Sequence, residues 1–467
     1  QINLRHQGFH NLWLQRVLTG LRGRVVKRFG KLLGWFGWAR LAGLSSLIVL
    51  VAIRIADPSL VEIIRNQSFD TFQRLEPRVI GAQPVAIIDI DERSIKAIGQ
   101  WPWPRTTMAR MVQNTAASGA VSLGFDMVFA EADRLSPDQI VQDNPNLPKI
   151  VSDTLTNLPK NDTVFADMMA QFRVIVGQTA VRSIQDNRAD KQAVADVQVG
   201  FRGQDPTPHL LKFPDIVQNR PEFEKSASGR GVFTIRQDVD GVIRRVPLVM
   251  KVQEKIRLAL STEVLRVATG GSAFAITTDD AGIRDIRLAG KAIRTDKNGH
   301  VWPHYSPASQ TRYVSAMDVI NATEPLAQLQ GKLVLVGTSA IGLEDFRPTP
   351  LGISMPGVEI HAQVLENILS DELLFRPHYA IGVELLVSAA LGLLIVLLLP
   401  AMGALLSVLG TAAILVGYVW FSWFAFSEHR LLIDPAIPAL SCFAIFLIMA
   451  TSNYLREERR RQEEQTA

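Results

Sequence analysis

The sequence predicts an α/β domain, with a mixed, mainly parallel sheet and β-hairpins, joined to a four-helix transmembrane region. Four long apolar stretches lie near the two ends of the chain, and short Val/Ile-rich runs alternate with helical patterns between them. The mean hydropathy of +0.14 is high for a soluble protein. A hydrophobic fraction of 47% with 20% charged residues excludes a disordered or fibrous chain.

The apolar stretches predict transmembrane helices at residues 38–56, 380–399, 401–426 and 431–453. A bilayer core of about 30 Å needs roughly 20 helical residues, which these stretches approach or exceed. Glu384 and Asp434 are the only acidic or basic residues in the three C-terminal stretches, and both lie near an end. A buried helical core is the alternative interpretation, and three such runs in series disfavour it.

The distribution of basic residues predicts the orientation in the membrane. Residues 1–40 hold eight lysines and arginines and no acid, which places this end in the cytoplasm by the positive-inside rule. Four crossings then return 454–467 to the cytoplasm and leave 57–379 outside. Residues 1–37 are predicted to form a basic amphipathic segment on the inner leaflet, with a disordered tail as the alternative.

The external region shows the patterns of an α/β core. Turns at Asp238–Gly241, which ends in Asp–Gly, and at Asp296–Gly299 predict β-hairpins at 232–252 and 292–305. Residues 134–162 are predicted to form a surface insertion with one helical turn. The Val/Ile-rich runs predict strands at 85–90, 121–126, 173–178 and 333–337, with helices at 94–98, 108–118, 164–172 and 358–369.

Three aspartates form the candidate ligand site. Asp89 and Asp91 lie at the end of one predicted strand, and Asp126 lies at the end of another. We expect these strands to be adjacent and parallel, so that their carboxylates converge at the edge where open α/β sheets bind ligands. Oxygen ligands of this kind suit calcium or magnesium. In the alternative interpretation, Asp91 caps the next helix.

Between these aspartates lies the rigid segment Trp101–Arg105, with two aromatic residues and a cation. Trp101, Trp103 and Arg105 are candidates for binding an anion or a planar ligand. Alternatively, the tryptophans pack against the end of the sheet and Arg105 pairs with Asp89 or Asp126.

Other chemistry receives little support from the sequence. The single cysteine, Cys442, excludes an intramolecular disulfide and a cysteine metal cluster. A net charge of +4 gives no support to nucleic-acid binding. No catalytic set is found at recognisable spacing. Glu359 and His361, two residues apart on a predicted helix, do not share a face, which disfavours a metal pair.

The order of several motifs resembles the second type of CHASE domain, an extracellular sensory domain of bacterial cyclases and histidine kinases. The resemblance covers about residues 60–370. The motifs are Phe69–Phe72, Val85–Ser94, Gly99–Arg105, Gly119–Asp126, Asp238–Pro247, Leu333–Gly337, Thr349–Pro350 and Pro356–Ala362.

The resemblance implies a function and a set of partners. The family places one membrane helix before the sensor and three after it, followed by a cytoplasmic effector that is most often a class III adenylate or guanylate cyclase. It thus implies a multi-pass receptor in the bacterial plasma membrane, responding to an unknown external ligand or protein. It also implies a homodimer, and ATP with magnesium or manganese at the effector. A histidine kinase sensor, a membrane-anchored external enzyme and an external binding scaffold remain alternatives.

Residues 454–467 carry mixed charge in a helical pattern, with Glu457 and Arg461 spaced as a favourable i,i+4 pair. We expect this segment to continue the fourth membrane helix as a signal helix toward the effector, with a solvated tail as the alternative. The chain begins with Gln1 and carries no effector, so we expect it to be a segment of a longer protein.

Overall fold

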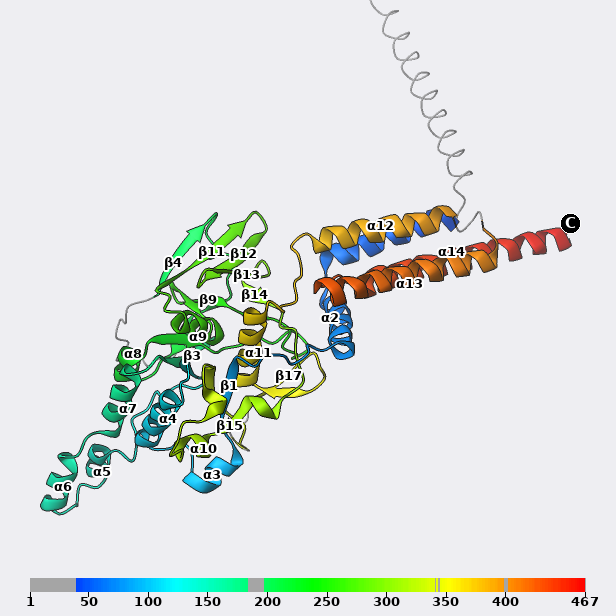
Figure 1. Cartoon of the computed structure of the whole chain (residues 1–467). Coiled ribbons are helices and arrows are strands. Elements are labelled where there is room, and N and C mark those ends of the chain that lie inside the picture. Colours follow the sequence, from blue (N-terminus) through cyan, green and yellow to red (C-terminus); the bar gives the residue numbers. More distant parts are fainter. Residues whose placement is uncertain (1–38, 184–196, 341, 343–344, 399–401, 467) are drawn as a thin grey trace, which may run out of the picture. The chain divides into compact units, whose positions relative to one another are not determined.

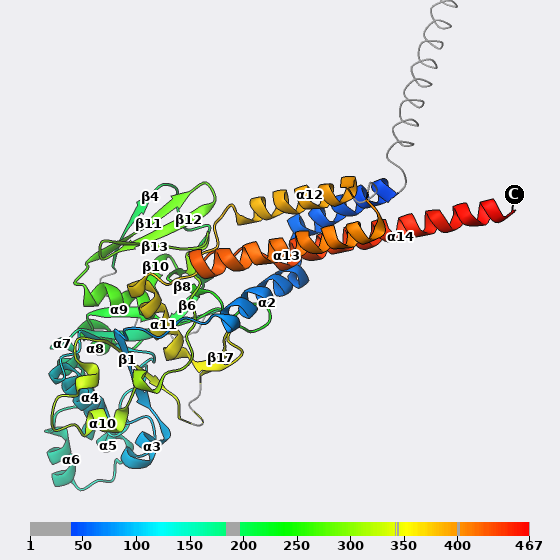
Figure 2. The ribbon, with the colours of Figure 1, turned by 45° about the vertical axis from the view of Figure 1, so that its right-hand side comes forward.

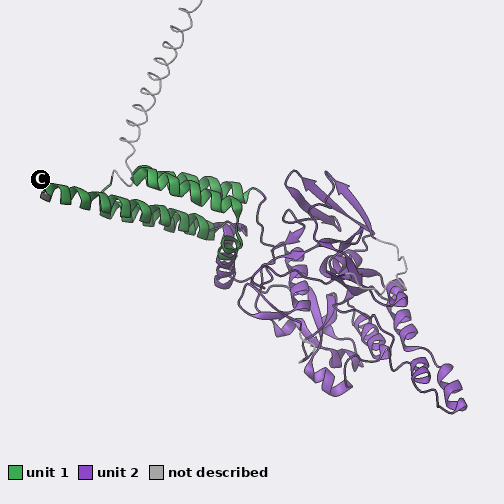
Figure 3. Cartoon of the chain, turned by 180° about the vertical axis from the view of Figure 1, so that it is seen from behind, with its two compact units in different colours: residues 1–65, 379–423, 434–467 green, residues 66–378, 424–433 purple. Residues whose placement is uncertain are grey.

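The computed structural model describes residues 39–183, 197–340, 342, 345–398 and 402–466. These fall into two compact units, which are described separately (Figure 3). Unit 1 comprises residues up to 65 together with 379–423 and 434–467, and unit 2 comprises 66–378 and 424–433. The predicted cytoplasmic segment 1–37 lies outside the described residues.

The helices of unit 2 and the helix that leads into it are short or of medium length (Figure 1). They are α2 Ser59–Leu75, α3 Glu92–Ile98, α4 Arg105–Ala117, α5 Pro137–Asp143, α6 Lys149–Thr156, α7 Asn161–Ala170, α8 Pro221–Ser226, α9 Leu260–Ala268, α10 Ala316–Ile320 and α11 Gly357–Ser370, with the 3-10 turns Gln310–Arg312 and Ala327–Leu329.

The strands of unit 2 form one large sheet and several small ones. They are β1 Val85–Ile90, β2 Ser122–Phe125, β3 Val174–Val181, β4 Gln198–Arg202, β5 Lys212–Phe213, β6 Asp215–Val217, β7 Gly229–Val232, β8 Val246–Pro247, β9 Val249–Val252, β10 Lys255–Leu258, β11 Ala273–Asp279, β12 Gly282–Leu288, β13 Lys291–Arg294, β14 His300–Val301, β15 Tyr313–Ser315, β16 Leu333–Thr338, β17 Phe346–Pro348 and β18 Ser354–Pro356.

A seven-stranded sheet forms the centre of unit 2. Its order is β15-β1-β16-β2-β3-β6, with β7 also pairing with β3. Every pair is parallel except β3 with β6. The predicted mixed, mainly parallel sheet is therefore confirmed. The four predicted core strands are β1, β2, β3 and β16.

Helices cover both faces of this sheet, because alternate residues of each strand point to opposite sides. On β1, Val85 and Ile87 join the apolar cluster that includes α9 and α11. Ala86 and Ile88 join the opposite cluster, which includes α4 and α7. Continuous burial on both faces explains why these strands appear in the sequence as uninterrupted apolar runs.

A smaller sheet of order β13-β12-β11-β4 contains two antiparallel hairpins, which join β11 to β12 and β12 to β13 (Figure 2). The fold thus includes β-hairpins, but the predictions of hairpins at 232–252 and 292–305 are wrong. Both turns form, closed by bonds from Gly241 N to Asp238 O and from Gly299 N to Asp296 O. However, β7 pairs with β3 and β8 with β14, whereas β13 pairs with β12.

The turn at Asp238 is held by the arginines that follow it rather than by a strand ladder. Arg244 is 1% exposed, and its guanidinium pairs with Asp240 at 2.6 Å, with Asp238 at 3.1 Å and with Asp70 of α2 at 2.7 Å. Burial lowers the pKa of Arg244, but Asp70 and Asp240 outweigh it, so that the net shift is upward. The cation is therefore fully charged, and it fixes the turn against α2.

The predicted surface insertion at 134–162 contains more structure than expected. Two helices, α5 and α6, replace the single predicted turn. Pro137 is the first residue of α5, and Pro148 immediately precedes α6. Proline is favoured at helix starts because its fixed φ angle suits the first turn, so these prolines begin helices rather than loops.

Among the described residues, four helices are long and apolar enough to cross a membrane. They are Ala39–Ala56, α12 Ala380–Leu398, α13 Ala404–His429 and α14, whose candidate span is Ala436–Gln465. The predicted four-helix region is thus confirmed as a set of helices, whereas the sidedness remains a prediction.

Small residues allow the helices of unit 1 to pack closely. A β-carbon at Gly43 would lie 2.9 Å from Val396 of α12, and one at Gly392 would lie 2.7 Å from Leu47. Around them Ile395, Val396, Cys442, Ile445 and Met449 form a common apolar core with Leu47. Close backbone approach through small residues is a usual basis of helix association in membranes.

A buried ionic network ties three segments of unit 1 together. Arg54 pairs with Glu384 of α12 at 2.7 Å and with Asp57 at 2.9 Å, and Glu384 Oε1 accepts a hydrogen bond from Asp434 N at 2.9 Å. Asp434 Oδ1 in turn accepts from Ala436 N, which caps α14. Glu384 and Asp434, the only acidic or basic residues in the three predicted C-terminal membrane stretches, thus join helices to one another.

Candidate functional site

The candidate site lies at the carboxyl edge of the large sheet, where β1, β16 and β2 end. Asp89 is paired in register with Gly337 of β16, and Asp126 follows Phe125, which is paired with Val336. Both aspartates therefore flank Gly337. Strands lie about 4.8 Å apart, so the two backbones are separated by roughly 10 Å. The expectation that β1 and β2 are adjacent is wrong, because β16 lies between them.

Helix α11 begins at this edge. A β-carbon at Gly337 would lie 2.4 Å from Val358, so that only glycine permits the first turn of α11 to pack so closely on β16. A β-carbon at Gly357, the first residue of α11, would lie 2.8 Å from Asp345 Oδ2 and 3.7 Å from Asp126 Oδ2. Two carboxylates therefore meet at the N-terminus of α11, where the helix dipole favours negative charge.

The environment changes the acidity of these groups. Burial, and then the neighbouring Asp345, raise the pKa of Asp126 to about 7, and Arg347 opposes the shift only in part. Burial is also the largest cause at Asp89, and Asp91 and Glu359 add to it. The pKa of Asp89 therefore rises to about 6, although a hydrogen bond from Ser339 Oγ at 2.7 Å opposes the shift. Both carboxyls titrate closer to neutral pH than an ordinary aspartate.

Asp91 has a different role in the structure. Its Oδ1 accepts hydrogen bonds from Ser94 N at 2.8 Å, from Ser94 Oγ at 2.5 Å and from Ser315 Oγ at 3.0 Å. It is therefore the N-cap of α3, as the alternative interpretation of the sequence has it. This capping role ties the end of β1 to the end of β15.

The aromatic segment packs as part of the core. Trp103 is 2% exposed, its Nε1 donates to Gly99 O at 2.8 Å, and its ring meets that of Trp101 edge to face. Arg105 pairs with neither Asp89 nor Asp126. It faces Asp162 of α7, with Nε 3.7 Å from Oδ1, and its guanidinium lies 4.7 Å from the centre of the Phe129 ring. Its backbone N–H donates to the carboxylate of Asp133 at 2.7 Å.

The buried face of α11 adds residues that the sequence analysis did not assign to the site. Arg312 is fully buried and pairs with Glu359, and its Nη2 lies 2.9 Å from Glu366. Arg78 pairs with Glu366 at 2.5 Å. Although burial lowers the pKa of Arg312, Glu359 and Glu366 outweigh it, so that the net shift is upward. A chain of charged groups thus runs from the carboxyl edge along the helix.

His361 lies one turn from Gly357 on the same face of α11. It is 1% exposed, its Nε2 is 3.2 Å from Phe233 O, and Nδ1 has no hydrogen-bond partner among the described residues. Burial lowers the pKa of His361 to about 4, whereas Asp345 acts in the opposite direction. The histidine is therefore neutral at physiological pH.

The buried acids of α11 have a signal in the sequence, because polar residues recur on a single helical face of an otherwise apolar segment, at Glu359, Gln363, Glu366 and Asn367. Asp345 lies in a loop and has no such signal. Within the described ranges, no group of three or more metal-ligating side chains is placed to hold an ion. The arrangement offers a pair of carboxyls whose charge is sensitive to a proton or a cation.

The family model described as "CHASE2 domain" matches residues 45–402. The chain belongs to the CHASE2 family. The resemblance inferred from the motifs is thereby confirmed, and so is the α/β sensor fold with its apolar helices. Neither the curated proteins nor the solved structures include a significant match. With its CHASE2 domain and four apolar helices, the chain is a membrane-associated sensor.

Proposed function

We propose that this chain is the sensor and membrane part of a bacterial receptor that controls a class III adenylate cyclase. One observation carries the proposal. Helix α14 runs without a break from Ala436 to Thr466, from an apolar span into a charged segment that includes the 2.8 Å pair of Arg461 with Glu457. A continuous helix transmits a shift or rotation from the membrane to a domain joined to its end.

The sidedness follows from the basic ends of the sequence. With eight basic residues and no acid in 1–40, we place both termini in the cytoplasm and the CHASE2 domain outside the plasma membrane. This arrangement puts the charged end of α14 on the side where ATP is found. The partners are then the lipid bilayer and an external ligand or protein.

The cue, in this proposal, acts at the N-terminal end of α11. Burial, and then repulsion from Asp345, raise the pKa of Asp126 there. A proton or cation that neutralises one carboxylate would relieve the repulsion and change how α11 is held. Only residues 371–379 separate α11 from the membrane helix α12, so a movement of α11 has a short covalent path to the membrane.

The choice of a cyclase rests on the family resemblance. Class III cyclase sites form between two subunits, so the proposal includes a homodimer. The cyclase would use ATP with magnesium or manganese, since nucleotidyl transfer needs divalent ions beside the triphosphate. Of the cytoplasmic stretches in this topology, only the C-terminal helix carries acids, and these are glutamates interleaved with arginines.

Expression in cyclase-deficient bacterial cells tests this function. We expect the natural full-length protein to raise intracellular cyclic AMP and residues 1–467 alone to make none. Because the product forms where ATP is present, cyclic AMP from the full-length protein also requires the end of α14 to be cytoplasmic. Cyclic nucleotide from residues 1–467 alone would contradict the proposal. Phosphate transfer to a histidine, without cyclic AMP, would replace the cyclase by a kinase.

A further inference from the structure

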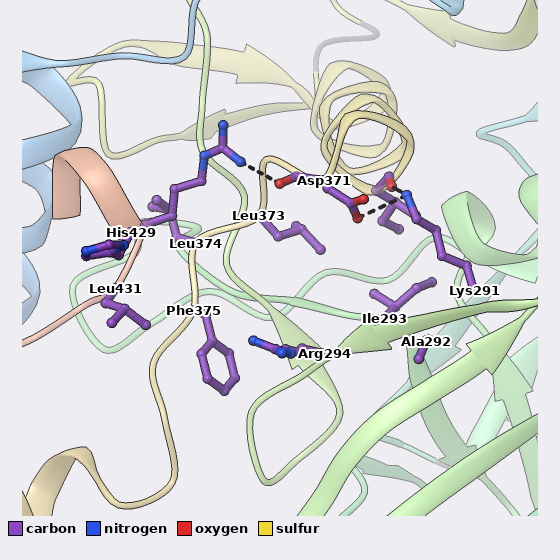
Figure 4. A pocket seen from close by; sticks show the side chains of 12 residues that line it. Lys291, Ala292, Ile293, Arg294, Asp371, Leu373, Leu374, Phe375, His429 and Leu431 are labelled. Atoms are coloured by element: carbon purple, nitrogen blue, oxygen red, sulfur yellow. Dashed lines mark hydrogen bonds and ion pairs between the residues drawn. The ribbon is translucent and has the colours of Figure 1, made fainter. Parts of the chain in front are cut away.

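Unit 2 contains a cavity of about 390 Å³ that is separate from the carboxyl edge. Three segments line it, as Figure 4 shows: strand β13, the C-terminal end of α11 with the residues that follow, and His429–Leu431 at the end of α13. Strand β13 is an edge strand of its sheet. Segments far apart in the sequence thus converge on one space.

Two cations in this cavity stabilise the end of α11. Lys291 Nζ donates to Ile368 O at 2.5 Å and pairs with Asp371 at 3.0 Å. Arg430 Nη1 donates to Asp371 O at 2.6 Å. The last carbonyl groups of a helix lack partners within the helix and favour positive charge. Lys291 and Arg430 therefore have a structural role.

Arg294, the third cation that lines the cavity, does not contribute to stabilising the end of α11. Its side chain is exposed and has neither an ion pair nor a hydrogen bond within the described ranges. Its guanidinium lies 5.7 Å from the centre of the Phe375 ring. Lys291 and Arg430 are balanced by Asp371 and by Glu372, whose carboxylate is 3.6 Å from Arg430. The positive charge left over is that of Arg294.

Besides His429, the remaining wall of the cavity includes the apolar side chains of Ile293, Leu373, Phe375 and Leu431. A ligand that fits beside Arg294 therefore combines an anionic group with an apolar portion. Helix α13 has 26 residues and spans about 39 Å, compared with a hydrocarbon core of about 30 Å. A helix of this length extends beyond the hydrocarbon core into the lipid headgroups, where phosphate is abundant.

We propose that this cavity binds a phosphate-bearing anion and that Arg294 is its anion-binding residue. The planar guanidinium presents paired donors that match phosphate oxygens. A phospholipid headgroup and a soluble phosphate ester share this chemistry. The site goes beyond cue sensing at the carboxyl edge and does not depend on the identity of the effector.

The test uses the whole chain purified in a neutral detergent and titrated with dioctanoyl phosphatidylglycerol or with glycerol 3-phosphate. We expect saturable binding, weakened about tenfold in Arg294→Gln because a charge-assisted hydrogen bond is lost. The matched control is Arg202→Gln, an exposed arginine of β4 at the opposite edge of the same sheet. This control is expected to bind like the unaltered chain.

The two probes distinguish the sources of phosphate. Arg294-dependent binding of the lipid alone assigns the cavity to a headgroup, and Arg294-dependent binding of both assigns it to phosphate esters in general. Thermal melting checks that Arg294→Gln remains folded. The proposal is overturned if neither probe binds, or if Arg294→Gln and Arg202→Gln bind with equal affinity.

Discussion

The N-terminal end of α11 meets two carboxylates, Asp126 and Asp345, whereas its C-terminal end meets two cations, Lys291 and Arg430. Both pairings suit the helix dipole. They differ in how their charges are compensated. Each cation at the C-terminal end donates to a backbone carbonyl and has an acidic partner. At the N-terminal end Asp345 pairs with Arg347, whereas burial, and then the neighbouring Asp345, keep the pKa of Asp126 near 7.

This difference indicates which end can respond to a signal. In the function proposed above, the N-terminal end of α11 is the responsive end, because a carboxyl group with a raised pKa changes its charge when a proton or cation arrives. The C-terminal end is then a fixed attachment beside the cavity of Arg294. Three substitutions test this difference.

The largest effect on stability is expected between the two ends of α11, at the buried ion pairs of Arg312 with Glu359 and Glu366. Arg312→Met leaves Glu359 without its cationic partner and removes one of two partners from Glu366. Removing one member of a buried pair costs about 3–5 kcal/mol, so we expect a loss of this size in the free energy of unfolding. The measurement is urea denaturation of the chain in detergent micelles.

Arg93→Met is the matched control for this prediction. Arg93 pairs with Asp318 at the surface, with side chains 58% and 43% exposed, and surface pairs contribute about 0–1 kcal/mol. If Arg312→Met and Arg93→Met unfold at the same urea concentration, the ion pairs of Arg312 with Glu359 and Glu366 do not hold α11.

A smaller effect is expected at the cationic end. Lys291→Met removes the bond to Ile368 O and the pair with Asp371, which lowers the free energy of unfolding by about 0.5–1 kcal/mol. The measurement is urea denaturation of the chain in detergent micelles. Lys149→Met, at an exposed position of α6, is the control. If Lys291→Met and Lys149→Met unfold at the same urea concentration, Lys291 does not hold this end of α11.

The sequence predicted the local elements better than their arrangement. The run VAIIDI gave the bounds of β1 as the structure has them, because burial on both faces leaves an uninterrupted apolar signal. For Asp91, which stands between a strand and a helix, the sequence left capping open as the alternative to a ligand role, and the structure shows the cap. The insertion of β16 between β1 and β2 depends on pairing across some 200 residues, which no local pattern reports.

The candidate site was predicted only in part for the same reason. Asp89 and Asp126 were found because they end apolar strands. Asp345 lies in a loop without a periodic signal and reaches Asp126 only through the packing of α11 on Gly337. Arg105 pairs with Asp162 of α7 rather than with the strand ends, because α4 and α7 pack together on one face of the sheet.

The stability of the chain as a function of pH tests whether burial and the neighbouring Asp345 make the charge of Asp126 responsive to pH at the N-terminal end of α11. The pKa of Asp126 is raised from 3.8 to about 7 on folding, so the folded state binds this proton more tightly than the unfolded state. The stabilisation is complete below pH 4 and is lost as pH rises toward 7. Asp126→Asn removes this loss.

We therefore predict that Asp126→Asn gains about 1–3 kcal/mol relative to the unaltered chain between pH 4 and pH 8. The stability of Asp153→Asn, at an exposed position of α6, should follow that of the unaltered chain throughout. Parallel curves for Asp126→Asn and the unaltered chain across this range would contradict the account.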